Sequence, residues 1–416
     1  MSILSTVTRM YLTRSFRPFV FTDRNDSSVE YQDLVNLGLY VHIPFCRSIC
    51  QFCPYCKMQY VPDLADRYMD ALMHEIDLVC SGKERRKVTS LYFGGGSPAL
   101  LSDRTGEVVK KLGTYFDIEE GMGIELHPSD LQEDILGSLK MAGIDRVSIG
   151  IQSFNNKYQH ILGRKKIDTD HLSRILSDFS FDTVSMDFIF ALPGQSFADL
   201  KADLDMAFAL GANHVAIYPF IDFAFTKNEI GEMKKDEKRK LLDQTTRYLL
   251  DKGCVRKSIW TFASQKDAGY SSMTRDNFLG FGCSATTLLL DSFKINTFSV
   301  EEYIRRVHDH RLPTSLTIKF SLRQRMIYYL FWTLYGNEMR VSDFEAFFGE
   351  DFYRFYGLEF RVAEKLGLLE EKDGTYSMTL KGAFYYHHYE SFYTYSYIDK
   401  MWGIMSREAF PKRIKL

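Results

Sequence analysis

The chain has 416 residues, a formal net charge of −2, 45% hydrophobic residues and 25% charged residues. These values are typical of a globular protein that forms one large domain and a small one. The near-neutral charge argues against a dedicated nucleic-acid binder, which normally carries a basic excess. No apolar run reaches the roughly 18 residues of a membrane span, and the N-terminal segment lacks the apolar core of a secretory signal.

Residues 1–36 are expected to form an irregular lead-in, with a turn in the polar run 23–28. From residue 37, short apolar runs alternate with segments of helical periodicity, such as 64–80 and the segment after Ser102, a predicted N-cap. This alternation predicts an α/β fold with a parallel sheet that is closed or partly closed into a barrel. The predicted strands are Leu39–Ile43, Ser90–Phe93, Gly123–Leu126, Val147–Ile151, Thr183–Phe190 and His214–Tyr218.

The segment 40–60 holds four of the seven cysteines, and the odd total predicts reduced thiols in a cytoplasmic protein. Cys46, Cys50 and Cys53 have the spacing C-x3-C-x2-C, which puts three soft thiolates on one short loop, as iron–sulfur ligation requires. Three ligands leave one iron of a cubane cluster free to bind a small molecule. A zinc site is the main alternative, but His74, the nearest histidine outside the segment, has no partner beside it.

Further candidates follow the predicted strands, at the end where parallel barrels carry their active sites. The glycine run 94–96 lets the backbone approach a ligand closely, although a tight turn alone explains such a run equally well. Glu125 and Gln152 offer hydrogen bonds to a ligand, or simply cap the barrel mouth. Asp187 lies in an apolar strand, where a carboxylate is costly unless paired; Arg164 is its predicted partner, unless both bind a zwitterionic cofactor.

Taken in order, these motifs resemble those of the HemN-like family of radical S-adenosylmethionine (SAM) proteins, over about residues 37–300. The resemblance implies a partial (β/α)6 radical SAM barrel. It also implies a [4Fe-4S] cluster that cleaves SAM reductively to a 5′-deoxyadenosyl radical, with one SAM site or two. The cluster ligands are then Cys46, Cys50 and Cys53. The residues at cofactor-binding positions are Tyr40, Phe45, Gly94, Gly95, Glu125, Gln152, Arg164 and Asp187.

Departures from the family's patterns separate its members. Where the coproporphyrinogen III oxidases have a further cysteine two residues after the third ligand, this chain has Tyr55, with Cys56 one step later, and their Arg-Tyr-Thr-Ser-Tyr-Pro type segment is missing. The HNxxYW motif of the haem chaperone HemW is missing from 269–282. The resemblance therefore favours class C-type methyl transfer to an unsaturated or tetrapyrrole-type substrate. Oxygen-independent coproporphyrinogen III oxidase activity, the oxidative decarboxylation of propionates, and a non-catalytic HemW-like chaperone are the alternatives.

Two residues near the expected cluster are candidates for catalysis, Cys56 and Tyr40. Cys56 suits proton or hydrogen transfer, and a thiol simply packed near the cluster is the alternative. The cysteines expected to be plainly buried are Cys80 and Cys283. The expected partners are a small-molecule substrate and a low-potential electron donor such as flavodoxin or ferredoxin, and no nucleic acid.

The rest of the chain is expected to be helix-rich. We expect the barrel and its extension over 37–317, a small winged-helix-like HemN-type domain over 318–386, and an aromatic tail over 387–416. His387 and His388 in this tail allow a haem-carrier hypothesis by axial ligation, and the alternative is an aromatic helix docked against the barrel. The predicted elements are helices over 323–334, 341–348 and 352–366 and a hairpin wing over 367–379.

Overall fold

Six parallel strands form the centre of the molecule. The computed structural model describes residues 3–23, 28–226, 230–264 and 276–416. Its 14-stranded mixed sheet has the order β12-β13-β11-β10-β9-β8-β6-β2-β14-β15-β16-β17-β1-β21. The α/β class and the six predicted strands are confirmed, with small shifts at their ends. The parallel strands are β2 (Leu37–Ile43), β6 (Leu91–Gly95), β8 (Met122–Leu126), β9 (Arg146–Gln152), β10 (Thr183–Phe190) and β11 (His214–Pro219).

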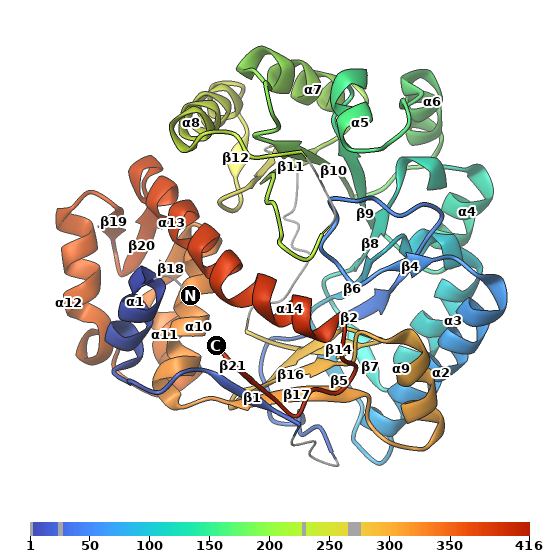
Figure 1. The fold of residues 1–416 in the computed structure, drawn as a ribbon, viewed down its shortest axis with the longest axis horizontal. Coiled ribbons are helices and arrows are strands. Elements are labelled where there is room, and N and C mark those ends of the chain that lie inside the picture. Colours follow the sequence, from blue (N-terminus) through green and yellow to red (C-terminus); the bar gives the residue numbers. More distant parts are fainter. Residues whose placement is uncertain (1–2, 24–27, 227–229, 265–275) are drawn as a thin grey trace.

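Helices connect these strands and lie outside the arc that the strands follow (Figure 1). In α2, every fourth residue from Leu64 to Ile76 is buried, as its periodicity predicts. The predicted N-cap at Ser102 is wrong: the 3₁₀ turn η1 (Pro98–Leu101) leads straight into α3, so Leu101 takes the cap position. The connecting helices are α2 (Pro62–Cys80), α3 (Ser102–Leu112), α4 (Glu133–Met141), α5 (Asn156–Ile161), α6 (Thr169–Asp178), α7 (Phe197–Ala209) and α8 (Lys235–Asp251).

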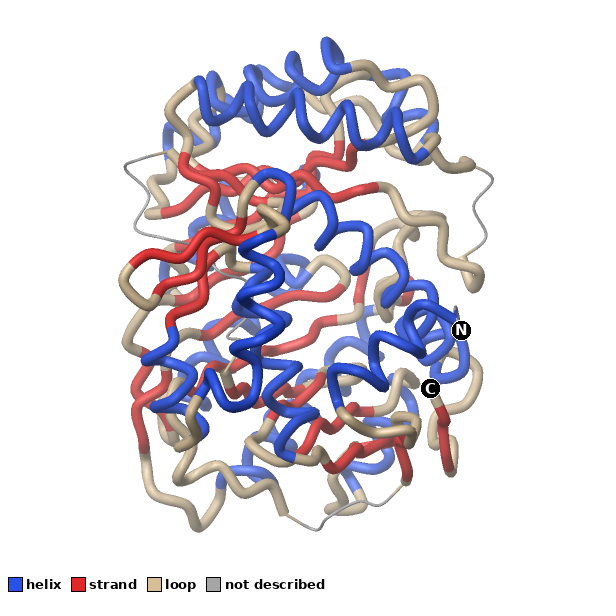
Figure 2. Tube along the Cα trace, turned by 90° about the vertical axis from the view of Figure 1, so that its left-hand side faces the viewer, coloured by secondary structure: helices blue, strands red, loops and turns tan. Residues whose placement is uncertain are grey.

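Antiparallel strands extend the sheet at both edges, and helices pack around the resulting layer (Figure 2). Beyond β11 lie β13 (Thr261–Ala263) and β12 (Val255–Arg256), which end the parallel arc. Beyond β2 the sheet continues through β14, which is parallel to β2, to strands from both chain ends. The elements on that side are β14 (Asn277–Phe281), β15 (Thr286–Leu288), β16 (Ser292–Asn296), α9 (Val300–His308), β17 (Thr314–Lys319), β1 (Val20–Thr22) and β21 (Arg413–Lys415).

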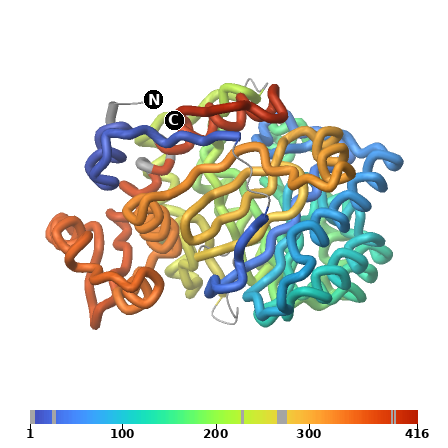
Figure 3. Tube along the Cα trace, turned by 90° about the horizontal axis from the view of Figure 1, so that it is seen from below, coloured from blue at the N-terminus to red at the C-terminus, as the bar shows by residue number. Residues whose placement is uncertain are grey.

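The two ends of the chain lie side by side (Figure 3). β1 pairs with β21, Phe21 opposite Ile414, and both side chains join one apolar core. The irregular lead-in that we predicted is thus wrong in detail, because it contains α1 (Ile3–Thr13) and β1; part of the predicted turn at 23–28 lies outside the described residues. Periodicity did not reveal β1 because three residues are too few to show a pattern.

A second, aromatic-rich core holds the helices after β17 together, around residues such as Phe344, Phe352 and Tyr376. The predicted helices and hairpin are present, and β18 adds a third strand beside the hairpin, as in a winged helix. The division of the chain into domains stays a prediction. The elements are α10 (Leu322–Tyr335), β18 (Glu338–Arg340), α11 (Val341–Phe348), α12 (Phe352–Lys365), β19 (Leu369–Lys372) and β20 (Thr375–Met378).

The last helices cross the front of the molecule in the view of Figure 1. α13 (Leu380–Tyr393) continues through the π-helical turn η3 (Thr394–Ile398) into α14 (Asp399–Met405). In the described part of the chain, no helix combines the length and apolarity that a bilayer span requires. The remaining short elements are β3 (Phe45–Cys46), β4 (Met58–Gln59), β5 (Arg86–Val88), β7 (Phe116–Ile118) and η2 (Pro128–Asp130).

Candidate active site

The loop that follows β2 is tied at its base. Its first residues, in β3, pair in parallel with β4. The N–H of Met58 donates to the carbonyl of Pro44 at 2.8 Å, and the N–H of Tyr60 donates to the carbonyl of Cys46 at 2.9 Å. The segment 47–57 therefore begins and ends at the paired strands β3 and β4, so its cysteines lie on a loop that is closed at its base.

The three predicted cluster ligands, here called the triad (Cys46, Cys50 and Cys53), are free thiols and half-buried. The N–H of Cys53 donates to the carbonyl of Cys50 at 3.4 Å, so a turn separates the second and third of these cysteines. Burial raises the pKa of Cys46 to about 12, while a hydrogen bond with the Ser97 side chain opposes the rise. The triad is thus a set of soft donors on one loop, and it fits a [4Fe-4S] cluster.

Arg164 lies beside the triad. Its Nη1 donates to the carbonyl of Gly150 at 2.6 Å. Burial lowers the pKa of its guanidinium, and the nearby thiols of the triad act in the opposite direction by favouring the charged form. A half-buried cation at this place offsets the negative charge that three bound thiolates bring.

The predicted pairing of Arg164 with Asp187 is wrong. The Asp187 carboxylate accepts hydrogen bonds from Ser148 Oγ at 2.9 and 2.8 Å and from Ser185 Oγ at 3.2 Å. Burial raises the pKa of Asp187 to about 6, against the effect of the two hydroxyls. The carboxylate is satisfied within its own sheet because Ser148 pairs in register with Ser185, and Asp187 follows two residues later on the same face.

Close contact between β2 and the end of β6 explains the glycine run. A Cβ at Gly95 would lie 2.7 Å from His42 Cε1, and a Cβ at Gly96 would lie 2.9 Å from Cys46 Sγ. Gly95 also has a φ of +121°, which favours glycine. The N–H of Gly96 donates to the carbonyl of Ile43 at 2.8 Å. The run thus forms a backbone shelf directly beside the first triad cysteine.

A carboxylate lies against this shelf. Glu125 accepts from the N–H of Gly95 at 3.0 Å and from the Tyr92 hydroxyl at 3.4 Å. Burial raises the pKa of Glu125 to about 7, and the negative charge of Asp187 raises it further. Two carboxyl groups that feel each other's charge at strand ends favour a positively charged group between them, and SAM carries an ammonium and a sulfonium.

Three further residues were predicted to bind the cofactor, namely Tyr40, Gln152 and Phe45. The Tyr40 hydroxyl lies 3.0 Å from His42 Nδ1. Burial raises the pKa of Tyr40 well above the usual range of a tyrosine. Gln152 has a φ of 70° at the point where the pairing of β9 with β10 shifts register, a strained conformation typical of functional sites. Phe45 is fully buried with its ring against those of Tyr60 and Tyr68, so it anchors the loop in the core.

Cys56 belongs to a group that the sequence did not reveal. Its Sγ lies 3.9 Å from Cys283 Sγ and 3.2 Å from the carbonyl oxygen of Phe298. The Cys283 thiol lowers the pKa of Cys56 and His42 adds to this effect, while burial opposes it. Cys80 and Cys283 are both buried, as predicted, but Cys283 is not a passive core residue. The sequence could have indicated His42, because it lies two residues after Tyr40 and therefore on the same face of the predicted strand. No pattern in the sequence connects Cys283 with this group.

Helix α14 lies over the loop. The ring of Trp402 lies 5.8 Å from that of Tyr55 and stacks on Phe223 at 6.3 Å, centroid to centroid. In α13, His387 is buried edge-on against Trp260 at 4.5 Å, and Glu390 accepts from Trp260 Nε1 at 3.2 Å. The structure thus supports the docked aromatic helix rather than haem ligation by His387.

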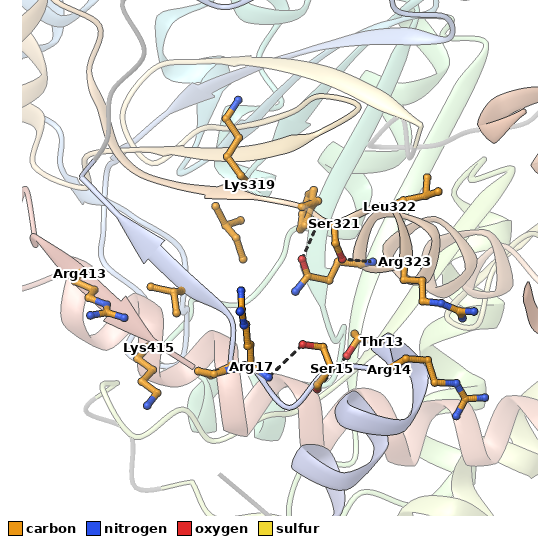
Figure 4. A pocket seen from close by; sticks show the side chains of 15 residues that line it. Thr13, Arg14, Ser15, Arg17, Lys319, Ser321, Leu322, Arg323, Arg413 and Lys415 are labelled. Atoms are coloured by element: carbon orange, nitrogen blue, oxygen red, sulfur yellow. Dashed lines mark hydrogen bonds between the residues drawn. The ribbon is translucent and has the colours of Figure 1, made fainter. Parts of the chain in front are cut away.

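A large open cleft lies away from these residues. It has a volume of about 960 Å³ between α1, β17, α10 and β21. Among the described residues, none of those that line it is acidic, and Figure 4 shows its cationic side chains. Two of these are paired with carboxylates that do not line the cleft, Arg14 with Glu359 and Lys319 with Asp291. The cationic residues are Arg14, Arg17, Lys319, Arg323, Arg413 and Lys415. The cleft shares no lining residue with the triad, so its size does not mark the active site, and its charge suits an anionic partner.

Known proteins share this architecture. Residues 40–207 match the family model described as the radical SAM superfamily. The heme chaperone HemW of Lactococcus lactis is 32% identical over 188 residues, 44% of this chain and 48% of that protein. The oxygen-independent coproporphyrinogen III oxidase of Synechocystis is 26% identical over 346 residues, 74% of each chain. The solved structure of coproporphyrinogen III oxidase (HemN) from Escherichia coli matches 93% of this chain and 98% of its own, with a TM-score of 0.76 at 21% identity, and so shows the same fold.

Proposed function

This chain belongs to the HemN-like radical SAM family, and on that premise we propose that it is an enzyme that starts a radical reaction on a tetrapyrrole-type substrate. The family's [4Fe-4S] cluster and SAM are its cofactors. The observation that carries the proposal is the triad on its tied loop, directly beside the glycine shelf and the Glu125 carboxylate that lies against it.

We assign the following roles to the residues of the site. Cys46, Cys50 and Cys53 hold the cluster as thiolates. When bound, the cluster and SAM together supply a 5′-deoxyadenosyl radical. Glu125 binds the positive end of SAM while the Gly95 N–H fixes the orientation of its carboxylate. Tyr40, Gln152, Arg164 and Asp187 complete the cofactor pocket, and α14 keeps water from the loop.

The preferred reaction is oxidative decarboxylation of propionate side chains, as in oxygen-independent coproporphyrinogen III oxidases. The relative named above for this activity aligns with three quarters of the present chain, whereas the HemW relative is matched over about half of its own length. Because of these relatives, we prefer this reaction to class C-type methyl transfer, which the motifs alone favoured. Methyl transfer stays the second candidate because Tyr55 and Cys56 depart from the oxidase pattern. Half of the segment 269–282, in which the HemW motif is missing, lies outside the described residues.

We propose that the reducing electron comes from an acidic low-potential carrier such as flavodoxin or ferredoxin. The cationic cleft supports this proposal, because it would attract such a carrier. Met401 and Met405 of α14 share one apolar core with Ile414 of β21, and Trp402 of the same helix contacts Tyr55, so one helix links the strand beside the cleft to the cysteine loop. Seven free thiols also favour a reducing, cytoplasmic location.

The test is an anaerobic incubation of the cluster-loaded protein with coproporphyrinogen III, a strong reductant and methyl-labelled SAM. Loss of propionate carbon as carbon dioxide, with 5′-deoxyadenosine and without S-adenosylhomocysteine, is expected. Label transferred to the tetrapyrrole, with S-adenosylhomocysteine, would replace the oxidase assignment by methyl transfer. Tight haem binding with neither product, in wild type and in a Cys46→Ala variant alike, would overturn the enzyme proposal.

A further inference from the structure

Three side chains outside the triad converge beside the cofactor shelf. His42 comes from β2, Cys56 from the loop after the triad, and Cys283 from the segment after β14. The ligand atoms of these three side chains all lie within 4.8 Å of one another. Within residues 3–23, 28–226, 230–264 and 276–416, they are the one group of three or more His, Cys, Asp or Glu side chains with this spacing. We call them the Cys2His group.

We propose that the Cys2His group binds a single divalent metal ion of the zinc type, with one coordination position left for an exogenous ligand. Two thiolates and one imidazole form a ligand set known for zinc, and three protein ligands are the pattern of sites that keep a position open. This site is separate from the triad and does not depend on the reaction proposed above.

The distance between the two sulfur atoms fits this assignment. Two sulfurs bound at about 2.3 Å to a tetrahedral zinc ion lie about 3.8 Å apart. The Cys56 and Cys283 sulfurs are 3.9 Å apart, so a metal fits between them without backbone movement. A disulfide needs about 2.05 Å, and both cysteines are free thiols in this structure. The geometry therefore favours a bridging metal over a disulfide.

His42 is held in the orientation that a metal ligand needs. Its Nδ1 pairs with the Tyr40 hydroxyl at 3.0 Å, and its Nε2 lies on the side of Cys56, 3.2 Å from Ser284 Oγ. When Nδ1–H donates to Tyr40, Nε2 offers its lone pair to a metal, which is the usual arrangement behind a metal-bound histidine. Nε2 also lies 3.0 Å from the Cys56 carbonyl, which can only accept, so Nε2 carries the proton while no metal is bound. Metal binding requires the tautomer with the proton on Nδ1, where it donates to Tyr40, and replaces the carbonyl contact by the metal bond.

The segment that carries Cys283 is fixed from α2. Glu75 accepts from the N–H of Gly282 at 2.6 Å, and the Tyr68 hydroxyl accepts from the N–H of Cys283 at 2.9 Å. Gly282 has a φ of +99°, and a Cβ there would lie 2.5 Å from the His42 carbonyl oxygen. The glycine therefore allows β14 to approach β2 closely enough to bring the sulfur to the imidazole. Such a preformed geometry lowers the cost of binding.

Charge balance also favours a metal. Two thiolates at a half-buried site are costly alone, and one divalent cation neutralises both. The site adjoins the shelf, since a Cβ at Gly95 would lie 2.8 Å from His42 Nε2. A metal here would act as a Lewis acid, and its open position would accept an oxygen, nitrogen or sulfur atom of an exogenous ligand.

The test uses Co²⁺ as the probe. The full chain with all three triad cysteines changed to Ala, which removes iron binding by the triad, is titrated anaerobically with Co²⁺. One Co²⁺ per chain is expected, with thiolate-to-cobalt charge-transfer bands and the visible bands of tetrahedral cobalt. Cys56→Ser and Cys283→Ser should each abolish the charge-transfer intensity of a two-thiolate site. Tyr40→Phe should weaken binding by about 10-fold, because it removes only the partner of His42.

Cys254→Ser is the matched control, since Cys254 is a buried free cysteine elsewhere and its loss should change nothing. If the triad variant does not fold, zinc is counted in cluster-loaded wild type and Cys283→Ser; one zinc per chain in the wild type and none in the variant is expected. The proposal fails if stoichiometric Co²⁺ gives no charge-transfer band, or if the band survives Cys283→Ser. It also fails if anaerobically prepared protein contains a Cys56–Cys283 disulfide.

Discussion

The triad and the Cys2His group are neighbouring sulfur sites that are built in opposite ways. The triad comes from one short loop, and its spacing alone marks it as an iron–sulfur motif. The Cys2His group joins three elements, and its two cysteines are 227 residues apart. The sheet brings the ligand atoms of the Cys2His group within 4.8 Å of one another, close enough for one ion. Local sequence thus specifies one site and tertiary packing the other.

The largest effect that distinguishes the two sites is expected when a cysteine of the triad is substituted. Cys46→Ala, Cys50→Ala or Cys53→Ala each removes one of the three proposed cluster ligands. Each should reduce 5′-deoxyadenosine formation by more than the roughly 100-fold that the loss of an outer-shell partner can cost. Cys56→Ala should leave iron content unchanged. Iron and sulfide content and product formation are measured for each variant. Iron loss in Cys56→Ala would mean that Cys56 also holds the cluster and that the two sites are not separate.

The next effect concerns the residue that fixes the Cys2His group. Glu75 is 2% exposed and also accepts hydrogen bonds from Asn296 and Tyr303. Glu75→Ala removes the acceptor of the Tyr303 hydroxyl, the Gly282 N–H and one N–H of Asn296, whose amide keeps its bond to the Gly282 carbonyl. It should lower the free energy of unfolding by about 3 kcal/mol. Asp70→Ala is the control on the same helix: its exposed ion pair with Arg104 should contribute less than about 1 kcal/mol. Denaturant unfolding measures both, and equal losses would contradict the assigned role.

The same residue gives stability a pH dependence. Burial raises the pKa of Glu75 to about 7 from an ordinary value of 4.5. The folded chain therefore holds more protons than the unfolded chain between these two values. The contribution of this group to the free energy of unfolding is fully present below pH 4.5 and falls as the pH rises to 7, by up to about 3 kcal/mol. Glu75→Gln should flatten the curve, and an unchanged slope would argue against a titrating Glu75.

A smaller effect is expected at the shelf that serves the triad. Burial raises the pKa of Glu125 to about 7, so its carboxylate charge is lost as the pH falls below that value. If the charged form binds the positive end of SAM, affinity should fall by at most about tenfold per pH unit below 7. Glu125→Gln should bind SAM weakly and without this pH dependence. Equilibrium binding between pH 6 and 8 tests this, and an identical pH profile in the variant would remove Glu125 from the SAM site.

The sequence could predict whatever depends on short-range pattern. The parallel strands and the helices of the C-terminal third follow from hydrophobic periodicity, and the triad follows from its spacing. The pairing of Arg164 with Asp187 was wrong because only the register of β9 and β10 places Ser148 and Ser185 around that carboxylate. The role of Cys283 could not be predicted, because it depends on β14 lying beside β2.

The smallest expected effect concerns these serines. Ser148→Ala removes one of the two hydroxyls that donate to Asp187, which should raise the pKa of that carboxyl above its present value of about 6. The free energy of unfolding should fall by about 1 kcal/mol. Unfolding measurements on Ser148→Ala and Ser185→Ala check this, and a loss of several kcal/mol would mean that the serine contributes more than one hydrogen bond.

The measurement that tests the account most directly is the anaerobic cleavage of SAM by the reduced, cluster-loaded protein. We predict 5′-deoxyadenosine and methionine in equal amounts from the wild type and from Cys254→Ser, and none from the variant that lacks all three triad cysteines. Cleavage that persists without the triad, or no cleavage by a fully loaded wild type, would contradict the assignment of this loop as the catalytic centre.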